Sequence, residues 1–171
     1  MRKIRLFIAS SLDGYIADKE GNVDWLFTDD DYGYSEFFNQ IDTLIMGNKT
    51  YQQILGFGEY PYPGKEAFVF STRLHGEEDD HVKFVGENLD DFINNLRQSS
   101  GNNIWLVGGS QLIKFFLENN FLDEIILAIH PLILGDGIPL FLNSNNIKKI
   151  LKLQNIKTYD SGLLQVFYDV Q

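Results

Sequence analysis

The sequence of 171 residues contains no cysteine. This absence excludes disulfide bonds and thiolate metal sites, and it favours a cytoplasmic location. The chain also has no apolar run near the 18 residues that a membrane-spanning helix needs. Residues 1–6 enter a strand pattern directly and do not resemble a signal peptide. We therefore expect a cytoplasmic protein that has no membrane partner.

Positive charge is scarce, because 14 Lys and Arg face 24 Asp and Glu, for a formal net charge of −10. Nucleic acids and anionic membranes require basic surfaces, so neither is expected as a partner. Hydrophobic residues make up 44% of the chain and aromatic residues 14%. This composition supports one sizeable core, and the length predicts a single domain over residues 1–171.

Short apolar runs alternate with amphipathic segments. Strands are predicted at 4–10, 43–46, 67–71, 82–85, 104–107 and 124–129, with a terminal pair at about 151–159 and 163–170. Helices are predicted at about 34–41, from 48 or 49, at 89–97 and from 110. The turn Asp160-Ser161-Gly162 predicts that the last two strands form a hairpin. The pattern predicts a three-layer α/β/α domain whose mixed, mostly parallel sheet carries a C-terminal antiparallel hairpin.

Two strand-to-helix junctions are typical of nucleotide binding. Residues 104–112 (IWLVGGSQL) place two glycines before Ser110, which we interpret as a helix cap, and residues 44–51 (LIMGNKTY) repeat the arrangement. Glycine lets a backbone approach a ligand closely, and the free N–H groups of a first helical turn bind phosphate. Carboxyl ends of parallel strands share one edge of a sheet. The sequence therefore predicts a nucleotide or dinucleotide at this edge.

A third strand ends in Ser71-Thr72-Arg73. Lys49 and Arg73 would then lie beside hydroxyl groups and helix N-termini at the same edge. Each cation taken singly is more typical of a solvated surface charge. Taken together, they predict a clamp for a pyrophosphate and a further phosphate.

The order of SLDGYIA, DTLIMGNKTY, FVFSTR, IWLVGGSQL and HPLILGDGIPLF resembles the dihydrofolate reductase-like superfamily, over nearly the whole chain. SLDGYIA and the segment 131–141 are most similar to the reductase domain of the bifunctional riboflavin-biosynthesis deaminase/reductase. The resemblance implies an NADPH-dependent oxidoreductase similar to 5-amino-6-(5-phosphoribosylamino)uracil reductase. It also implies a small heterocyclic substrate and a homodimer, for which residues 129–134 and the terminal hairpin are candidate surfaces.

The resemblance also implies a set of cofactor-binding positions. The nicotinamide would contact Ala9, Ile16 and Ala17. The adenosine side and the pyrophosphate would contact Gly47, Asn48, Lys49, Thr50, Gly108, Gly109, Ser110, Gln111 and Leu112, and the 2′-phosphate region would contact Ser71, Thr72 and Arg73. The family's glycine pair is joined by a cis peptide, which we expect between Gly108 and Gly109. Asn48 stands where the family commonly has Arg, so a preference for NADPH over NADH rests on Lys49 and Arg73.

The substrate side is less defined. Dihydrofolate reductases hold the pterin with a carboxylate near the first helix, and three residues here are candidate catalytic carboxylates: Asp30, Asp31 and Glu36. Capping of the helix dipole is the alternative interpretation of this acidic run. Tyr15, Trp25 and Tyr34 are candidate walls for a flat substrate. His130, at a strand end, is interpreted as structural rather than catalytic.

A substrate phosphate would require a second basic cluster, for which Lys65 and Arg97 are the remaining candidates. The zinc deaminase half of the riboflavin enzyme needs a histidine and two cysteines, and this chain has no cysteine. Two alternatives stay open. One is dihydrofolate reductase activity proper, and the other is a nucleotide-binding module without turnover.

Overall fold

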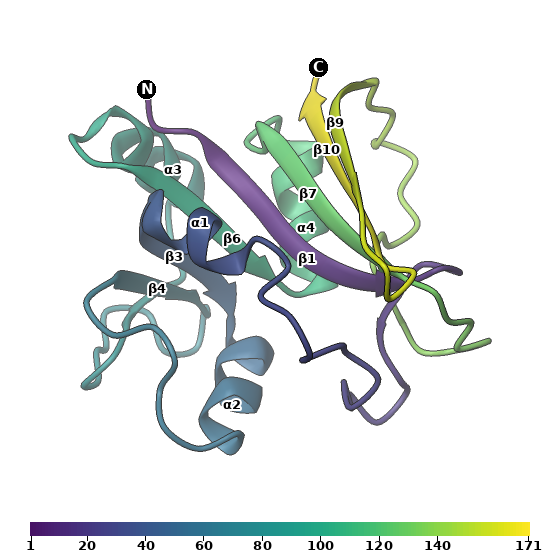
Figure 1. Ribbon diagram of the computed structural model, residues 1–171. Coiled ribbons are helices and arrows are strands. Elements are labelled where there is room, and N and C mark those ends of the chain that lie inside the picture. Colours follow the sequence, from purple (N-terminus) through teal and green to yellow (C-terminus); the bar gives the residue numbers. More distant parts are fainter.

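The computed structural model describes residues 1–171 (Figure 1). Its main sheet has eight strands in the order β5-β4-β3-β6-β1-β7-β10-β9. These strands are β1 (Ile4–Ser11), β3 (Ile41–Gly47), β4 (Glu66–Phe70), β5 (Lys83–Val85), β6 (Asn103–Gly108), β7 (Glu124–His130), β9 (Leu151–Thr158) and β10 (Leu164–Val170). The helices are α1 (Tyr34–Asn39), α2 (Asn48–Gly56), α3 (Leu89–Gln98) and α4 (Ser110–Glu118).

Six neighbouring strands, from β5 to β7, run parallel to one another. Strand β10 is antiparallel to both β7 and β9, which gives the hairpin at one side of the sheet. The carboxyl ends of the six parallel strands therefore lie along one edge, here called the carboxyl edge, and the opposite side is the amino edge. The predicted mixed, mostly parallel sheet with a C-terminal hairpin is confirmed.

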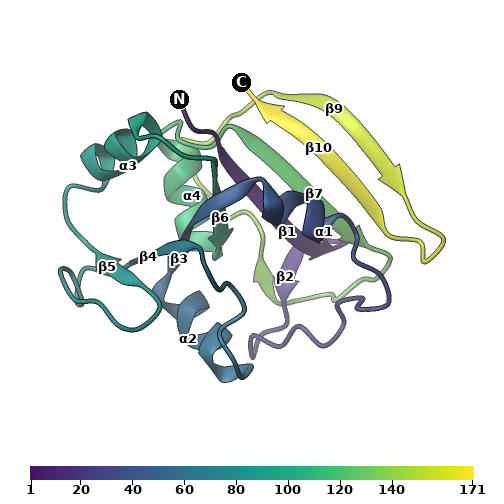
Figure 2. The ribbon, with the colours of Figure 1, turned by 60° about the vertical axis from the view of Figure 1, so that its left-hand side comes forward.

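Helices cover both faces of the sheet (Figure 2). Residues of α3 and α4 pack with Leu6 and Ile104 in one core, whereas residues of α1 and α2 pack with Leu44, Met46 and Trp105 in the other. Successive residues of a strand point to opposite faces, so neighbouring side chains contribute to different cores. None of the helices combines the length and apolar character needed to cross a membrane.

Two short strands were not predicted. Strands β2 (Tyr15–Ala17) and β8 (Ile138–Pro139) pair with each other outside the main sheet. Their backbones approach closely at Gly137, where an added Cβ would lie 2.2 Å from the carbonyl oxygen of Ala17. This contact joins the loop after β7 to the segment after β1 at the carboxyl edge.

Candidate active site

Two helix N-termini lie side by side at the carboxyl edge. Strands β3 and β6 are hydrogen-bonded neighbours, and α2 and α4 begin directly after them. The N-cap residues are Gly47 and Gly109, and neither helix has a side-chain cap. A Cβ on Gly109 would lie 3.4 Å from Thr50 Oγ1, so the two first turns are in close proximity. Uncapped N–H groups of two adjacent helices form a site that favours an anion.

The interpretation of Ser110 as a helix cap is wrong. Ser110 is the first residue of α4, and its hydroxyl donates a hydrogen bond to the carbonyl oxygen of Pro139 in β8. The preceding residue has the extended backbone of an N-cap, so the serine is one position too late to cap. Ser110 instead links α4 to the small sheet. The peptide bond between Gly108 and Gly109 is cis, as the family resemblance implied.

Lys49 and Arg73 are exposed cations that the structure leaves without a hydrogen bond or an ion pair. Lys49 lies in the first turn of α2, and Arg73 follows β4, the neighbour of β3. The Ser71 N–H donates to Val85 O at 2.9 Å. A Cβ on Gly86 would lie 2.3 Å from Ser71 O, so close packing fixes the backbone after β4. Both cations are therefore free to bind an anion at the half of the edge that β3 and β4 form.

The segment of residues 12–33 follows the carboxyl edge between β1 and α1. At one end, Leu12 N–H donates to Leu132 O at 2.8 Å. Further along, Gln53 Nε2 of α2 donates to Gly21 O at 2.6 Å. The segment therefore extends from the loop after β7 to α2, and it carries Tyr15, Ile16, Ala17 and Trp25. Among the nicotinamide candidates, Ala17 is buried, Ile16 packs on the α4 core, and Ala9 packs against the cluster that contains Tyr32.

His130 holds this segment in place. It is buried at the end of β7, where its Nε2 accepts a hydrogen bond from the Phe27 N–H at 3.2 Å and its Nδ1 contacts Ala128 O at 3.2 Å. Burial lowers the pKa of His130, so the imidazole is neutral at pH 7 and carries its proton on Nδ1. The rings of Trp25 and Phe27 pack edge-on against it. These contacts agree with a structural role.

The three candidate carboxylates do not share a pocket. Asp31 accepts hydrogen bonds from the Ser35 hydroxyl at 2.6 Å and from the Ser35 N–H, which lower the pKa of Asp31 and hold the first turn of α1. Asp30 is exposed and accepts from the Asp31 N–H at 2.6 Å. Glu36 is exposed and lies 3.9 Å from Lys157 Nζ. The N-cap of α1 is Gly33, two residues after Asp31, and the contact of Asp31 with a first-turn N–H agrees with the alternative interpretation, in which this acidic run stabilises the N-terminus of the helix.

An aromatic cluster lies between α1 and the sheet. Phe37 stacks on Phe7 of β1, with ring centroids 4.4 Å apart, and Trp105 Nε1 donates to Phe7 O at 3.2 Å. Tyr34 packs edge-on against Trp105, and its burial, with the nearby Asp31 carboxylate, raises the pKa of Tyr34. Sequence reasoning named Tyr34 but not Trp105 or Tyr62, which also packs edge-on against Trp105. Trp105 lies within an apolar strand run, so its only signal was that of a core residue.

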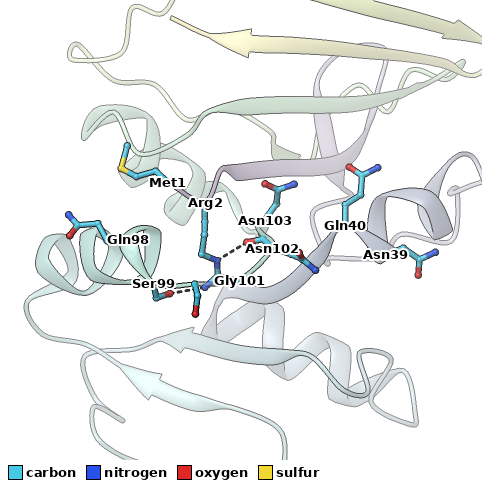
Figure 3. Close-up of a pocket in the computed structure, with 10 residues that line it drawn as sticks. Met1, Arg2, Asn39, Gln40, Gln98, Ser99, Gly101, Asn102 and Asn103 are labelled. Carbon is cyan, nitrogen blue, oxygen red and sulfur yellow. Dashed lines mark hydrogen bonds between the residues drawn. The ribbon is translucent and has the colours of Figure 1, made fainter.

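A hollow lies at the amino edge (Figure 3). It has a volume of about 610 Å³ and a mostly polar lining. Its Arg2 guanidinium already donates to Asn102 O at 2.7 Å, Ser99 Oγ at 3.1 Å and Thr43 Oγ1 at 2.6 Å, and it pairs with Asp42. This arginine ties the chain start to β3 and to the turn before β6. Because its donors are used internally, we place the functional site at the carboxyl edge, where helix N-termini and cations are free.

Solved structures share this architecture. A diaminohydroxyphosphoribosylaminopyrimidine deaminase/5-amino-6-(5-phosphoribosylamino)uracil reductase from Thermotoga maritima matches with a TM-score of 0.76 at 19% identity, covering 99% of this chain and 57% of that chain. The sheet order and the helices at the carboxyl edge define a dihydrofolate reductase-like α/β domain. Residues 63–165 match the family model of the RibD C-terminal domain. The chain belongs to this family.

Two further similarities extend over nearly the whole chain. A putative riboflavin biosynthesis protein from Shewanella sp. PV-4 has a TM-score of 0.87 and 31% identity, covering 99% of both chains. The uncharacterized protein YwjB of Bacillus subtilis is 39% identical over 166 residues, which is 95% of each chain. The similarity to YwjB spans both strand-to-helix junctions and the segment between β1 and α1.

Proposed function

We propose that this protein is an NADPH-dependent reductase of a flat heterocycle, similar to 5-amino-6-(5-phosphoribosylamino)uracil reductase. The observation that carries the proposal is the pair of uncapped helix N-termini, α2 and α4, at neighbouring strand ends beside two unpaired cations. A dinucleotide presents a pyrophosphate and, in NADPH, a 2′-phosphate. The geometry offers N–H groups for the first and the side chains of Lys49 and Arg73 for the second.

The residues fit such a cofactor. Gly47 and Gly109 keep Cβ atoms out of the space between the two first turns, and Thr50 adds a hydroxyl there. When bound, NADPH supplies a hydride to the substrate. The protein would hold the dinucleotide, position the substrate ring beside β1, and exclude water through the segment of residues 12–33. Membership of a family that contains reductases supports turnover over mere nucleotide binding.

The test is a titration of the protein with NADPH and, separately, NADH, followed by quenching of tryptophan emission. We expect NADPH to bind at least tenfold more tightly than NADH. The double variant Lys49→Ala/Arg73→Ala should reduce that preference to about threefold or less, since each exposed contact to phosphate contributes about 1 kcal/mol. Lys152→Ala removes another unpaired lysine, on β9, and should change neither affinity. Failure of the folded protein to bind either dinucleotide would refute the proposal.

We propose that the protein acts as a cytoplasmic homodimer that uses the terminal hairpin as its interface. Strand β9 is one of the two edge strands of the main sheet, the other being β5. Strand β9 exposes Leu151, Leu153 and Ile156, which are 39%, 48% and 49% accessible. Apolar side chains along an unpaired strand edge are a surface that a second chain would cover.

A further inference from the structure

The free cations of the carboxyl edge lie on one half of it, which also carries carboxylates after β5 (Glu87, Asp90 and Asp91). On the half formed by β3 and β4, Lys49 and Arg73 are unpaired. On the other half, the chain between β1 and α1 is strongly acidic. The segment of residues 12–33 and the first turn of α1 together hold eight carboxylates and a single lysine. The carboxylates are Asp13, Asp18, Glu20, Asp24, Asp29, Asp30, Asp31 and Glu36.

The few cations near the acidic half already have partners. Lys19 Nζ lies 2.5 Å from Asp136 Oδ2, in the loop that carries β8. Lys157 Nζ, near the end of β9, lies 3.9 Å from Glu36 Oε2. These ion pairs are exposed and therefore weak, but releasing either lysine would leave another carboxylate unpaired at the same place. The half of the carboxyl edge that holds residues 12–33 keeps its net negative charge whether these lysines are paired or released.

The two remaining candidates for binding a substrate phosphate lie elsewhere. Lys65, at the start of β4, donates to Ile41 O at 2.6 Å and to Phe38 O at 3.1 Å. Arg97, at the end of α3, pairs with Asp123 at 2.8 Å, directly before β7. Both positions are at the amino edge, where the parallel strands begin. Neither group faces the carboxyl edge.

The apolar part of the acidic half suits a ring. Trp25 and Phe27 pack around the neutral His130, and the indole Nε1 of Trp25 is shielded from water without a hydrogen-bond partner. Aromatic surface suits an uncharged heterocycle, whereas the carboxylates of the same segment repel an anion.

We propose that the substrate of this protein carries no phosphate and is a flat heterocycle that is neutral or positively charged. The inference rests on the proposed reductase function. It separates this chain from the Thermotoga maritima enzyme, whose name specifies a phosphoribosyl substrate. The two phosphate-binding cations would serve the dinucleotide alone. A second phosphate at the β1 and β7 half would lie among carboxylates with no free cation to offset it.

The experiment compares matched heterocycles with and without a phosphate. 5-Amino-6-ribosylaminouracil and riboflavin, each with its 5′-phosphate, are titrated by fluorescence against the protein with and without NADPH. We expect the unphosphorylated member of at least one pair to bind tenfold or more tightly than its phosphate. High salt should narrow the difference, because these charges are exposed. Tighter binding of the phosphorylated members, or no binding by any unphosphorylated member, would overturn the proposal.

A charge reversal tests whether the carboxylates cause the preference for unphosphorylated compounds. Asp24 is exposed and makes no side-chain hydrogen bond or ion pair, so Asp24→Lys should leave the fold intact and improve binding of the phosphorylated compounds about threefold. Glu66→Lys makes the same change of charge at the amino edge, at the start of β4; it breaks the exposed ion pair of Glu66 with Lys83 but should not change binding of the phosphorylated compounds. An equal effect of both variants would contradict the assignment. NADPH binding is measured in titrations separate from those of the heterocycles. A failure to bind NADPH would therefore refute the reductase function without deciding whether the protein prefers unphosphorylated heterocycles.

Discussion

Replacing His130 tests whether this histidine fixes the segment of residues 12–33. His130→Ala removes two hydrogen bonds of 3.2 Å, from Phe27 N–H and to Ala128 O, and two edge-on ring contacts with Trp25 and Phe27. Hydrogen bonds contribute about 1 kcal/mol each, and the ring contacts with the lost packing add about 1–2 kcal/mol. We expect the free energy of unfolding to fall by about 3 kcal/mol, measured as a lower urea midpoint at pH 8.

The same histidine predicts a pH dependence. Its pKa is lowered in the folded protein by burial, whereas the unfolded chain titrates near the ordinary value of about 6.5. The unfolded state therefore binds a proton that the folded state does not, and stability falls as the pH falls below about 6.5. His130→Ala lacks this contribution, so the difference between the two proteins should shrink from pH 8 to pH 5.

Two further variants complete the test. His130→Phe keeps an aromatic ring and loses both hydrogen bonds, so it should retain part of the lost stability. His75→Ala removes a histidine that is 42% exposed and should change stability by less than about 1 kcal/mol. A loss below about 0.5 kcal/mol in His130→Ala, or an unchanged pH profile between pH 8 and 5, would refute the assigned role.

Two predictions concern the small sheet and the edge strand β9. Gly137→Ala should lower the free energy of unfolding by about 2–4 kcal/mol in urea titrations. The reason is that φ of Gly137 is 153° and the new Cβ would lie 2.2 Å from Ala17 O. An unchanged urea midpoint would contradict the packing of β2 against β8. Light scattering should give a dimer for the native protein and a monomer for Leu153→Lys. The control variant Lys152→Ala should remain a dimer. A monomeric native protein at micromolar concentration would exclude the hairpin as an interface.

The regular elements could be predicted from the sequence because hydrophobic periodicity is strong in them. The strand predicted at 43–46 is observed at Ile41–Gly47, and the helix predicted at 89–97 is observed at Leu89–Gln98. Strands β2 and β8 could not be predicted in this way, since segments of three and two residues carry no period. Their pairing depends on a close approach at Gly137 that joins distant parts of the chain.

The candidate site was predictable at its strand ends and not on its substrate side. The glycine junctions are local signals, and the structure brings both to adjacent strands. The partner of the Ser110 hydroxyl lies 29 residues away in sequence, beyond the reach of a local pattern, so the capping interpretation took its place. Asp31 shows the reverse case, because its partner Ser35 is four residues away and capping was a local alternative.

Both chain ends lie on the side of the molecule opposite the carboxyl edge. Strand β1 begins there at Ile4, and β10 ends there at Val170 (Figure 1). Met1 is 88% exposed, whereas the Arg2 that follows it is buried in its ion pair. A linker or affinity tag joined before Met1 or after Gln171 would extend away from the helix N-termini. Protein immobilised through either end would therefore present its strand ends to solution, an orientation suited to surface-based measurement of dinucleotide capture.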